Sequence, residues 1–148
     1  MTHEAYMTEA ITLAEEAMAA GEVPVGCVLV GPDGQVIGRG RNRREAEGCA
    51  IAHAEILAIE AACQAYGDWR LTDCSLYVTL EPSPMCAGAI INARLGKVFY
   101  GAKDSTLGAA GSVINLFLER FGHEPALVGG LLEEPSSALM TNFFKGLR

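Results

Sequence analysis

The stretch from residue 75 to residue 102 most constrains the fold of this chain. Its pattern predicts a strand at residues 75–80, a helix at 85–93 and a second strand at 97–102. Two strands that are joined through one helix form a parallel pair with a right-handed crossover. The sequence therefore predicts a sheet that contains parallel strands and is covered by helices.

The rest of the chain continues this alternation. Residues 4–20 predict a helix that stops before Gly21, because they carry an apolar stripe at helical spacing, made of Met7, Ile11, Ala14 and Met18. We expect a hairpin, a helix, a loop, a helix, a short strand and a final helix at residues 25–42, 52–66, 104–112, 113–121, 126–128 and 135–146. This pattern predicts an α/β fold, a three-layer sandwich with a central mixed sheet of five strands.

Length and composition limit the class of protein. A chain of 148 residues, half of them hydrophobic and 20% charged, is expected to form a single domain over residues 1–148 and argues against disorder. No apolar run reaches the roughly 20 residues of a membrane span. The first ten residues lack the basic and apolar regions of a secretory signal. We therefore expect a cytoplasmic protein without a membrane partner.

Charge is unevenly distributed along the sequence. Eleven Lys and Arg against 18 Asp and Glu give a net charge of −7, which excludes a uniformly basic nucleic-acid binder but not a local basic patch. Residues 1–38 contain no Lys or Arg, and then four arginines arrive together: Arg39, Arg41, Arg43 and Arg44. This cluster is consistent with a solvated turn or with a patch that contacts phosphates.

The five cysteines are odd in number and irregularly spaced, which favours free thiols over disulfides. They are Cys27, Cys49, Cys63, Cys74 and Cys86. Most are expected in the core, since a free cysteine behaves as a small buried hydrophobe.

Two segments place reactive side chains where a helix begins, at residues 52–55 and 80–88. His53 and Glu55 are two positions apart, which would point them about 200° apart within a regular helix. They can converge only if His53 lies at the helix start. Ser83 and Cys86 are three apart, share one helix face, and could share a metal ion.

These residues carry a family resemblance. His53-Ala54-Glu55 followed by Pro82-Ser83-Pro84-Met85-Cys86 resembles the signature of the zinc-dependent cytidine and nucleobase deaminases. Within that superfamily, further segments along nearly the whole chain resemble the bacterial tRNA-specific adenosine deaminases: residues 21–26, 41–42, 69–71, 77–82 and 143–145. The resemblance implies a cytidine-deaminase-like fold and hydrolytic deamination of adenosine to inosine at the wobble position of a tRNA anticodon loop.

The resemblance also implies a cofactor, one Zn²⁺ per chain. His53 and Cys86 would be ligands, and Glu55 would be the catalytic proton shuttle, not a ligand. Ser83 stands where the family pattern has a third ligand, a cysteine, and a neutral hydroxyl is a poor zinc ligand. Three explanations remain open: Ser83 is a laboratory substitution, or it is natural and a water or its hydroxyl completes the site, or another cysteine does. Cys49 is one substitute to consider, whereas Cys74 is expected to lie too far away.

The substrate side follows from the same resemblance. Asn42, Pro24, Val25, Ala54 and Asp104 would bind the nucleoside, with Pro24 and Val25 as an apolar wall. Relatives commonly have a lysine where Thr106 or Leu107 stands here, which weakens the expectation of RNA contact in that loop. The expected phosphate contacts to an anticodon stem-loop are Arg41, Arg43, Arg44 and Lys145. The resemblance also implies a homodimer.

Three functions remain open from the sequence. The first is the tRNA adenosine deaminase. The second is a deaminase of free bases or nucleosides, for example guanine or cytosine, which suits the acidic chain. The third is a metal-impaired variant or non-catalytic subunit, which Ser83 favours and the retained Glu55 opposes.

Overall fold

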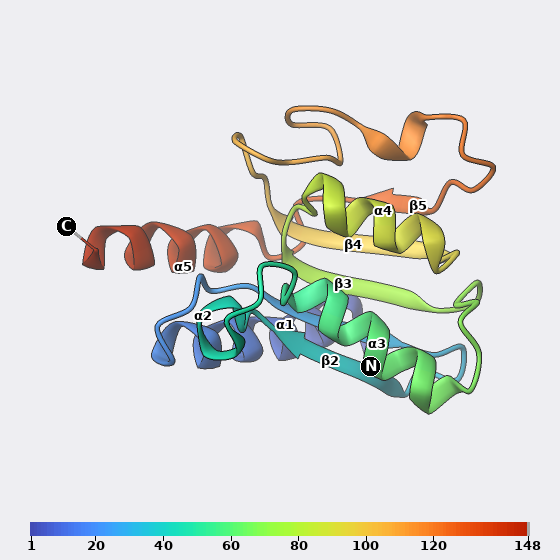
Figure 1. Cartoon of the computed structure of the whole chain (residues 1–148), viewed down its shortest axis with the longest axis horizontal. Helices are drawn as coiled ribbons and strands as arrows, with labels where there is room; N and C mark the ends of the chain where they lie inside the picture. Colours follow the sequence, from blue (N-terminus) through green and yellow to red (C-terminus); the bar gives the residue numbers. More distant parts are fainter. Residues whose placement is uncertain (148) are drawn as a thin grey trace.

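The computed structural model describes residues 1–147 and confirms the predicted α/β class (Figure 1). Its helices are α1 (His3–Ala19), α2 (Arg44–Glu47), α3 (Ala54–Tyr66), α4 (Pro84–Asn92) and α5 (Glu133–Gly146), with one 3₁₀ turn, η1 (Leu116–Leu118). Its strands are β1 (Gly26–Val30), β2 (Val36–Arg41), β3 (Ser75–Leu80), β4 (Lys97–Ala102) and β5 (Ala126–Val128).

The strands form one mixed sheet in the order β2-β1-β3-β4-β5. Strand β1 is antiparallel to both β2 and β3, whereas β3, β4 and β5 run parallel. The predicted hairpin, the parallel pair around α4 and the mixed five-stranded sheet are therefore all confirmed. Because β3 and β4 are parallel, their carboxyl ends lie at the same edge of the sheet.

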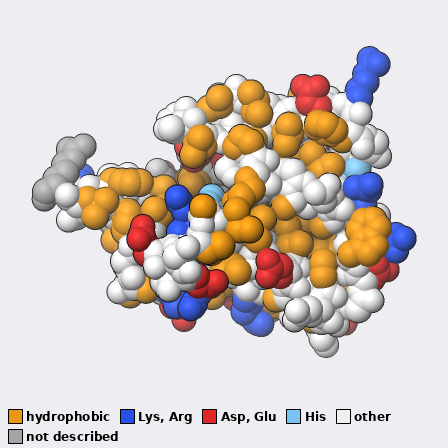
Figure 2. All heavy atoms as spheres, viewed as in Figure 1, with side chains coloured by type: hydrophobic (Ala, Val, Ile, Leu, Met, Phe, Trp, Pro, Cys, Tyr) orange, Lys and Arg blue, Asp and Glu red, His pale blue; other side chains and the backbone are white. Residues whose placement is uncertain are grey.

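Helices cover both faces of the sheet and make three layers. Helices α3 and α4 lie on one face, and α1 and α5 lie on the other (Figure 1). On the α3 and α4 side, hydrophobic side chains are visible across much of the surface (Figure 2). Within residues 1–147, none of the helices has the length and hydropathy that crossing a bilayer requires.

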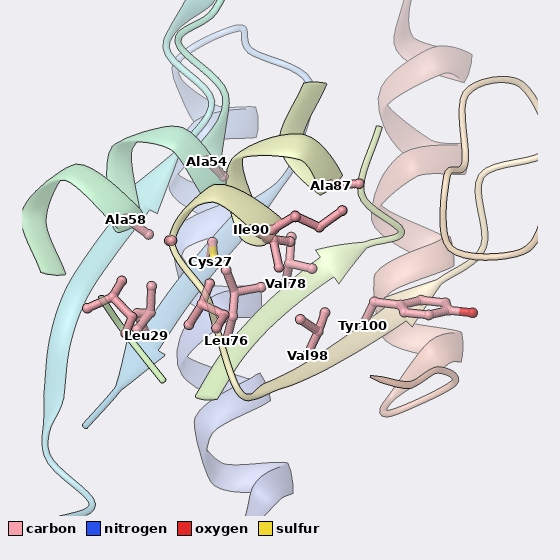
Figure 3. Packing of buried hydrophobic residues seen from close by; sticks show 14 of the residues in the cluster. Cys27, Leu29, Ala54, Ala58, Leu76, Val78, Ala87, Ile90, Val98 and Tyr100 are labelled. Atoms are coloured by element: carbon pink, nitrogen blue, oxygen red, sulfur yellow. The ribbon is translucent and has the colours of Figure 1, made fainter. Parts of the chain in front are cut away.

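The core is divided by the alternation of side chains along the strands. On β1, Cys27 and Leu29 point toward α3 and α4, into the larger buried cluster (Figure 3). Val28 points to the other face, where α1 packs against Tyr77 and Phe99. Those two rings stack with their centroids 4.7 Å apart. Each layer of helices therefore has its own apolar contact with the sheet.

Glycines bring α3 unusually close to β2. A Cβ atom on Gly40 would lie 2.8 Å from the backbone nitrogen of Ala58 and closer still to the carbonyl oxygen of Ala54. Gly38 makes the same approach one turn later, where its Cβ would be 3.0 Å from the nitrogen of Ala62. The backbone of α3 thus contacts the backbone of β2 directly, which fixes the distance between the first turn of α3 and the sheet.

Several parts of the expected secondary structure are corrected. The helix predicted at residues 113–121 is wrong, since only the 3₁₀ turn η1 forms there. The amide groups of Val113 and Leu116 donate to the carbonyl oxygens of Gly108 and Ala109, so the segment folds back on the preceding loop. Helix α2 was not predicted. Helix α5 begins two residues earlier than expected, and α3 begins two residues later. All five cysteines have free thiols, as expected.

Candidate functional site

The first turn of α3 brings His53 and Glu55 together. His53 is the N-cap residue, with an extended backbone (φ −84°, ψ 153°), and Glu55 is the second residue of the helix. The geometric condition for convergence is therefore met, because His53 lies before the helical spacing begins. Glu55 is almost completely buried, at 4% exposure. A buried carboxylate without a cationic partner is costly, which marks this position as unusual.

The first turn of α4 supplies the other half of the site. Ser83 is the N-cap residue, and its Oγ accepts a hydrogen bond from the backbone N–H of Cys86 at 3.3 Å. Pro84 follows at a position where its missing N–H costs nothing. Cys86 is buried, and its Sγ lies 3.6 Å from Nδ1 of His53. Two helix N-termini, both positive ends of helix dipoles, thus face one site.

Three side chains form a potential metal site. One donor atom each from His53, Glu55 and Cys86 lies within 4.8 Å of the others. An imidazole nitrogen and a thiol are donors that zinc prefers, so His53 and Cys86 fit a zinc ion. Ser83 lines the same pocket, but its hydroxyl oxygen already accepts the Cys86 amide. Within residues 1–147, neither Cys49 nor Cys74 belongs to this group of donors.

Burial dominates the electrostatics of the site. Burial raises the pKa of Glu55 to about 7, although its hydrogen bonds to backbone and to Cys86 oppose the shift. Burial and the charge of Arg44 lower the pKa of His53, which favours the neutral imidazole that metals bind. Burial and the Glu55 carboxylate raise the pKa of the Cys86 thiol. A divalent cation reverses that tendency, because a coordinating thiol is deprotonated.

A pocket of about 310 Å³ opens above these residues. It contains five of the predicted site residues besides His53 and Glu55, namely Val25, Asn42, Ser83, Asp104 and the predicted phosphate contact Arg44, whereas Cys86 does not line it. Pro24 and Ala54 are buried but do not line it, and Val23 takes the place expected of Pro24. The lining also includes residues not singled out as its walls from the sequence: Val23, Leu80, Glu81, Thr106, Leu107, Met140 and Phe144.

Asn42 is tied into the frame of the pocket. Its Oδ1 accepts a hydrogen bond from the backbone N–H of Ala54 at 2.9 Å, and its Nδ2 donates to the carbonyl oxygen of Val23 at 3.1 Å. The side chain therefore braces the start of α3 against the segment that precedes β1. One amide hydrogen of Nδ2 is left over for a ligand in the pocket.

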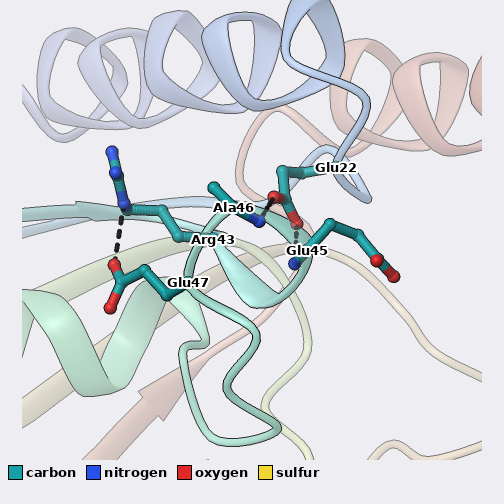
Figure 4. A network of polar contacts seen from close by, with 5 residues as sticks. All are labelled: Glu22, Arg43, Glu45, Ala46 and Glu47. Carbon is teal, nitrogen blue, oxygen red and sulfur yellow. Dashed lines mark hydrogen bonds and ion pairs between the residues drawn. The ribbon is translucent and has the colours of Figure 1, made fainter.

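The arginine cluster is divided between two surfaces. Arg44 lines the pocket, whereas Arg39, Arg41 and Arg43 line a separate groove beside β2. Arg43 pairs with Glu47 at 2.8 Å (Figure 4), and Nη1 of Arg41 donates to the carbonyl oxygen of Glu16. Lys145 is exposed near the end of α5. Of the predicted phosphate contacts, Arg44 is therefore the one at the pocket itself.

Several known proteins are similar to this chain over most of its length. The family model for the cytidine and deoxycytidylate deaminase zinc-binding region matches residues 1–102. A tRNA-specific adenosine deaminase of Bacillus subtilis is 50% identical over 146 residues, covering 98% of this chain and 90% of that protein. A structure from a study of A-to-I editing by tRNA:A34 deaminases at the wobble position is 43% identical, with a TM-score of 0.87. That match covers 91% of this chain and 98% of the other.

A third similar protein acts on a different substrate. Guanine deaminase from Bacillus subtilis is 45% identical, with a TM-score of 0.67, and the match covers 70% of this chain and 66% of that one. The matched family model spans most of the chain and includes the histidine, the glutamate and the cysteine that converge at the pocket. The chain belongs to the family of proteins with a cytidine and deoxycytidylate deaminase zinc-binding region.

Proposed function

We propose that this protein is a hydrolytic deaminase that converts adenosine to inosine at the wobble position of a tRNA anticodon loop. The observation that carries the proposal is the convergence of His53, Glu55 and Cys86, of which His53 and Glu55 line a pocket. It is supported by 50% identity to a tRNA-specific adenosine deaminase along 98% of the chain. Such a substrate is found in the cytoplasm, where we therefore expect the protein to work.

Each residue at the base of the pocket has a chemical task in this proposal. His53 and Cys86 would hold one zinc ion, and the third ligand position would be that of Ser83. When bound, zinc lowers the pKa of water so that hydroxide is available near neutral pH. Glu55, with a pKa of about 7, would take up one proton of the water and pass it to the ring nitrogen. It would then take up the second proton, from the hydroxyl group newly bound to the ring carbon, and pass it to the amino group, which leaves as ammonia.

The walls of the pocket suit an unpaired purine. Val23, Val25 and Leu80 offer apolar contacts to the faces and edges of a base, and Asn42 offers its remaining amide hydrogen. Arg44 at the rim would contact a phosphate that flanks the target nucleotide. Phe144 is half exposed at the same rim, where an adjacent base could stack on its ring. A single-stranded loop presents such a base without the cost of opening a duplex.

We further propose a homodimer that forms through the surface of α3 and α4. A shallow apolar groove between the two helices is lined by Ile56, Ile59, Trp69 and Ala89, among others. Trp69 is 50% exposed although its ring is flanked by Arg70 and Arg94, whose guanidinium carbons lie 4.5 and 5.9 Å from its centroid. A patch of this composition is typical of a protein interface.

A free purine base is the second candidate substrate. The similarity to a guanine deaminase favours it, as does a pocket whose size would hold one base or nucleoside. The two candidates differ in their need for phosphates. Turnover of RNA should fall steeply as salt is added, because cations compete with the protein for the phosphates, whereas turnover of a free base should not.

The test is inosine formation on an anticodon stem-loop with adenosine at the wobble position. We expect inosine from the purified chain loaded with zinc, more from a Ser83→Cys variant, and almost none from Glu55→Gln in that background. Free adenosine, guanine and cytosine are assayed in parallel. Ammonia release from a free base together with no inosine in the stem-loop would replace the proposal with the second candidate.

A further inference from the structure

Glu81 is a buried carboxylate that the proposed chemistry does not use. It follows β3 directly and is 2% exposed. Its carboxylate accepts four hydrogen bonds, all from one loop: from the amides of Asp104, Ala110 and Ser112, at 2.9 to 3.1 Å, and from the Ser112 hydroxyl at 2.5 Å. A loop of nine residues, 104–112, is thus gathered around one side chain.

The loop packs so closely against this carboxylate that only a glycine fits at position 108. A Cβ atom on Gly108 would lie 2.5 Å from Cδ of Glu81, with a carboxylate oxygen nearer still. One further bond fastens the loop nearby, from the amide of Ala109 to the carbonyl oxygen of Pro82 at 2.8 Å. The loop also exchanges backbone hydrogen bonds with residues 113–116, and it places Ala109 and Ala110 in the buried core. Other bonds lie within the loop. Asp104, for example, accepts from the amides of Thr106 and Leu107.

The same loop forms one side of the pocket. Asp104, Thr106 and Leu107 line it opposite Val23, Val25 and Asn42, which belong to the sheet side. The sheet side is held by strands and by α3, but the loop side has no helix or strand within residues 103–112 to hold it. Its place therefore depends on the four hydrogen bonds to Glu81, on the bond to Pro82 and on the burial of Ala109 and Ala110.

We infer that Glu81 is a positioning residue, which fixes residues 104–112 as a rigid wall of the pocket and thereby sets the affinity for substrate. The inference rests on the proposed function only for the identity of that substrate. It predicts that loosening Glu81 weakens substrate binding more than it slows the chemistry, since the side chains at the base of the pocket are held by α3 and α4.

The chain offers a matched control in a second buried carboxylate. Glu22 is 3% exposed and accepts from the amides of Glu45 and Ala46 at 3.1 and 2.8 Å, at the start of α2 (Figure 4). Both residues are carboxylates that bond backbone amides of a connecting segment. They differ in which segment they hold, so Glu81→Gln and Glu22→Gln should release different parts of the chain.

Hydrogen exchange tests the wall directly. In Glu81→Gln, an amide group faces backbone donors, and the amides of Asp104, Ala110 and Ser112 should exchange at least tenfold faster. Amides of residues 42–48 should keep their rates there and should instead exchange faster in Glu22→Gln. Ser112→Ala, which removes one of the four bonds, should give a smaller effect on the same loop. Equal acceleration along the whole chain, or no change in the loop, would overturn the inference.

Binding and turnover test the consequence. With the anticodon stem-loop, Glu81→Gln should raise Kd and KM about three- to tenfold, while kcat changes by less than twofold, both in the Ser83→Cys background. A released loop with unchanged Kd and KM would overturn the positioning role. If the parent chain itself fails to bind the stem-loop, the proposed function is wrong, and the exchange comparison still decides whether Glu81 fixes the wall.

Discussion

Replacing Gly40 with alanine should disturb the site from the far side of α3. The new Cβ would meet the nitrogen of Ala58 at 2.8 Å and the carbonyl oxygen of Ala54 at a shorter distance still. Neither atom belongs to a flexible side chain, so the first turns of α3 must move away by about 1 Å to reach normal contact. Overpacking of this kind costs about 1–3 kcal/mol of unfolding free energy.

The same displacement should reach the chemistry, because Ala54 lies between His53 and Glu55. A misplacement of about 1 Å can lower turnover by 10²-fold. Gly38→Ala is the control: it meets α3 one turn farther from the site, so it should cost similar stability and much less activity.

Urea unfolding and inosine formation, both in a Ser83→Cys background, measure the two effects. If Gly40→Ala keeps both stability and turnover, α3 is not seated by this contact. If both variants lose activity equally, the loss reflects general destabilisation.

Variants at three further residues test individual side chains. Burial raises the pKa of Tyr77 to about 12 from an ordinary value of 10, so its neutral form stabilises the fold below pH 10, and that contribution is lost as the pH rises toward 12. At pH 11 the parent should have lost about 1.4 kcal/mol more than Tyr77→Phe, by urea unfolding at pH 9 and 11; parallel curves would contradict this. Asn42→Ala leaves the Ala54 amide without its partner and should cost about 1–3 kcal/mol by the same assay, with a smaller loss in Asn42→Asp, which keeps the acceptor oxygen. Glu55→Gln should lower turnover about 10²–10⁴-fold without lowering zinc content, and a parallel loss of zinc would make Glu55 a ligand instead of a proton shuttle.

Most of the fold was predictable because its signals are local. The strands at residues 75–80 and 97–102 were predicted at the bounds that the structure has, since each is a short apolar run next to a helix. The segment 113–121 is apolar enough for a helix, yet its amides bond to the preceding loop. That pairing depends on how the loop folds around Glu81, which no periodicity in the sequence records.

The site was partly predictable for the same reason. The convergence of His53 and Glu55 required that the helix start after His53. The sequence stated this condition but predicted the helix over residues 52–66, whereas α3 begins at Ala54. The division of the arginines was also open to prediction, because Arg39 and Arg41 are two apart on a strand and must share a face. The contribution of Met140 and Phe144 was not, although their spacing puts them on one side of α5, because nothing in the sequence says which surface that helix meets.

Ser83 caps α4 and also stands at the position expected for a third zinc ligand. A cysteine there would weaken the cap and strengthen metal binding. As the N-cap of α4 its hydroxyl accepts the Cys86 amide, and a cysteine caps a helix less well, so Ser83→Cys should lower stability by up to about 1 kcal/mol without metal.

With zinc the order should reverse, because a thiolate at this corner binds zinc at about 2.3 Å and far better than a neutral hydroxyl. Zinc at about 100 times its Kd for the variant would stabilise the folded state of the variant by about 2.7 kcal/mol. Thermal unfolding of both chains, with a chelator and with added zinc, measures the two effects, and metal content after dialysis counts the bound ions. A variant that is more stable than the parent in the chelator would contradict the capping role. A parent that gains as much from zinc as the variant would mean that the serine site already binds the ion fully.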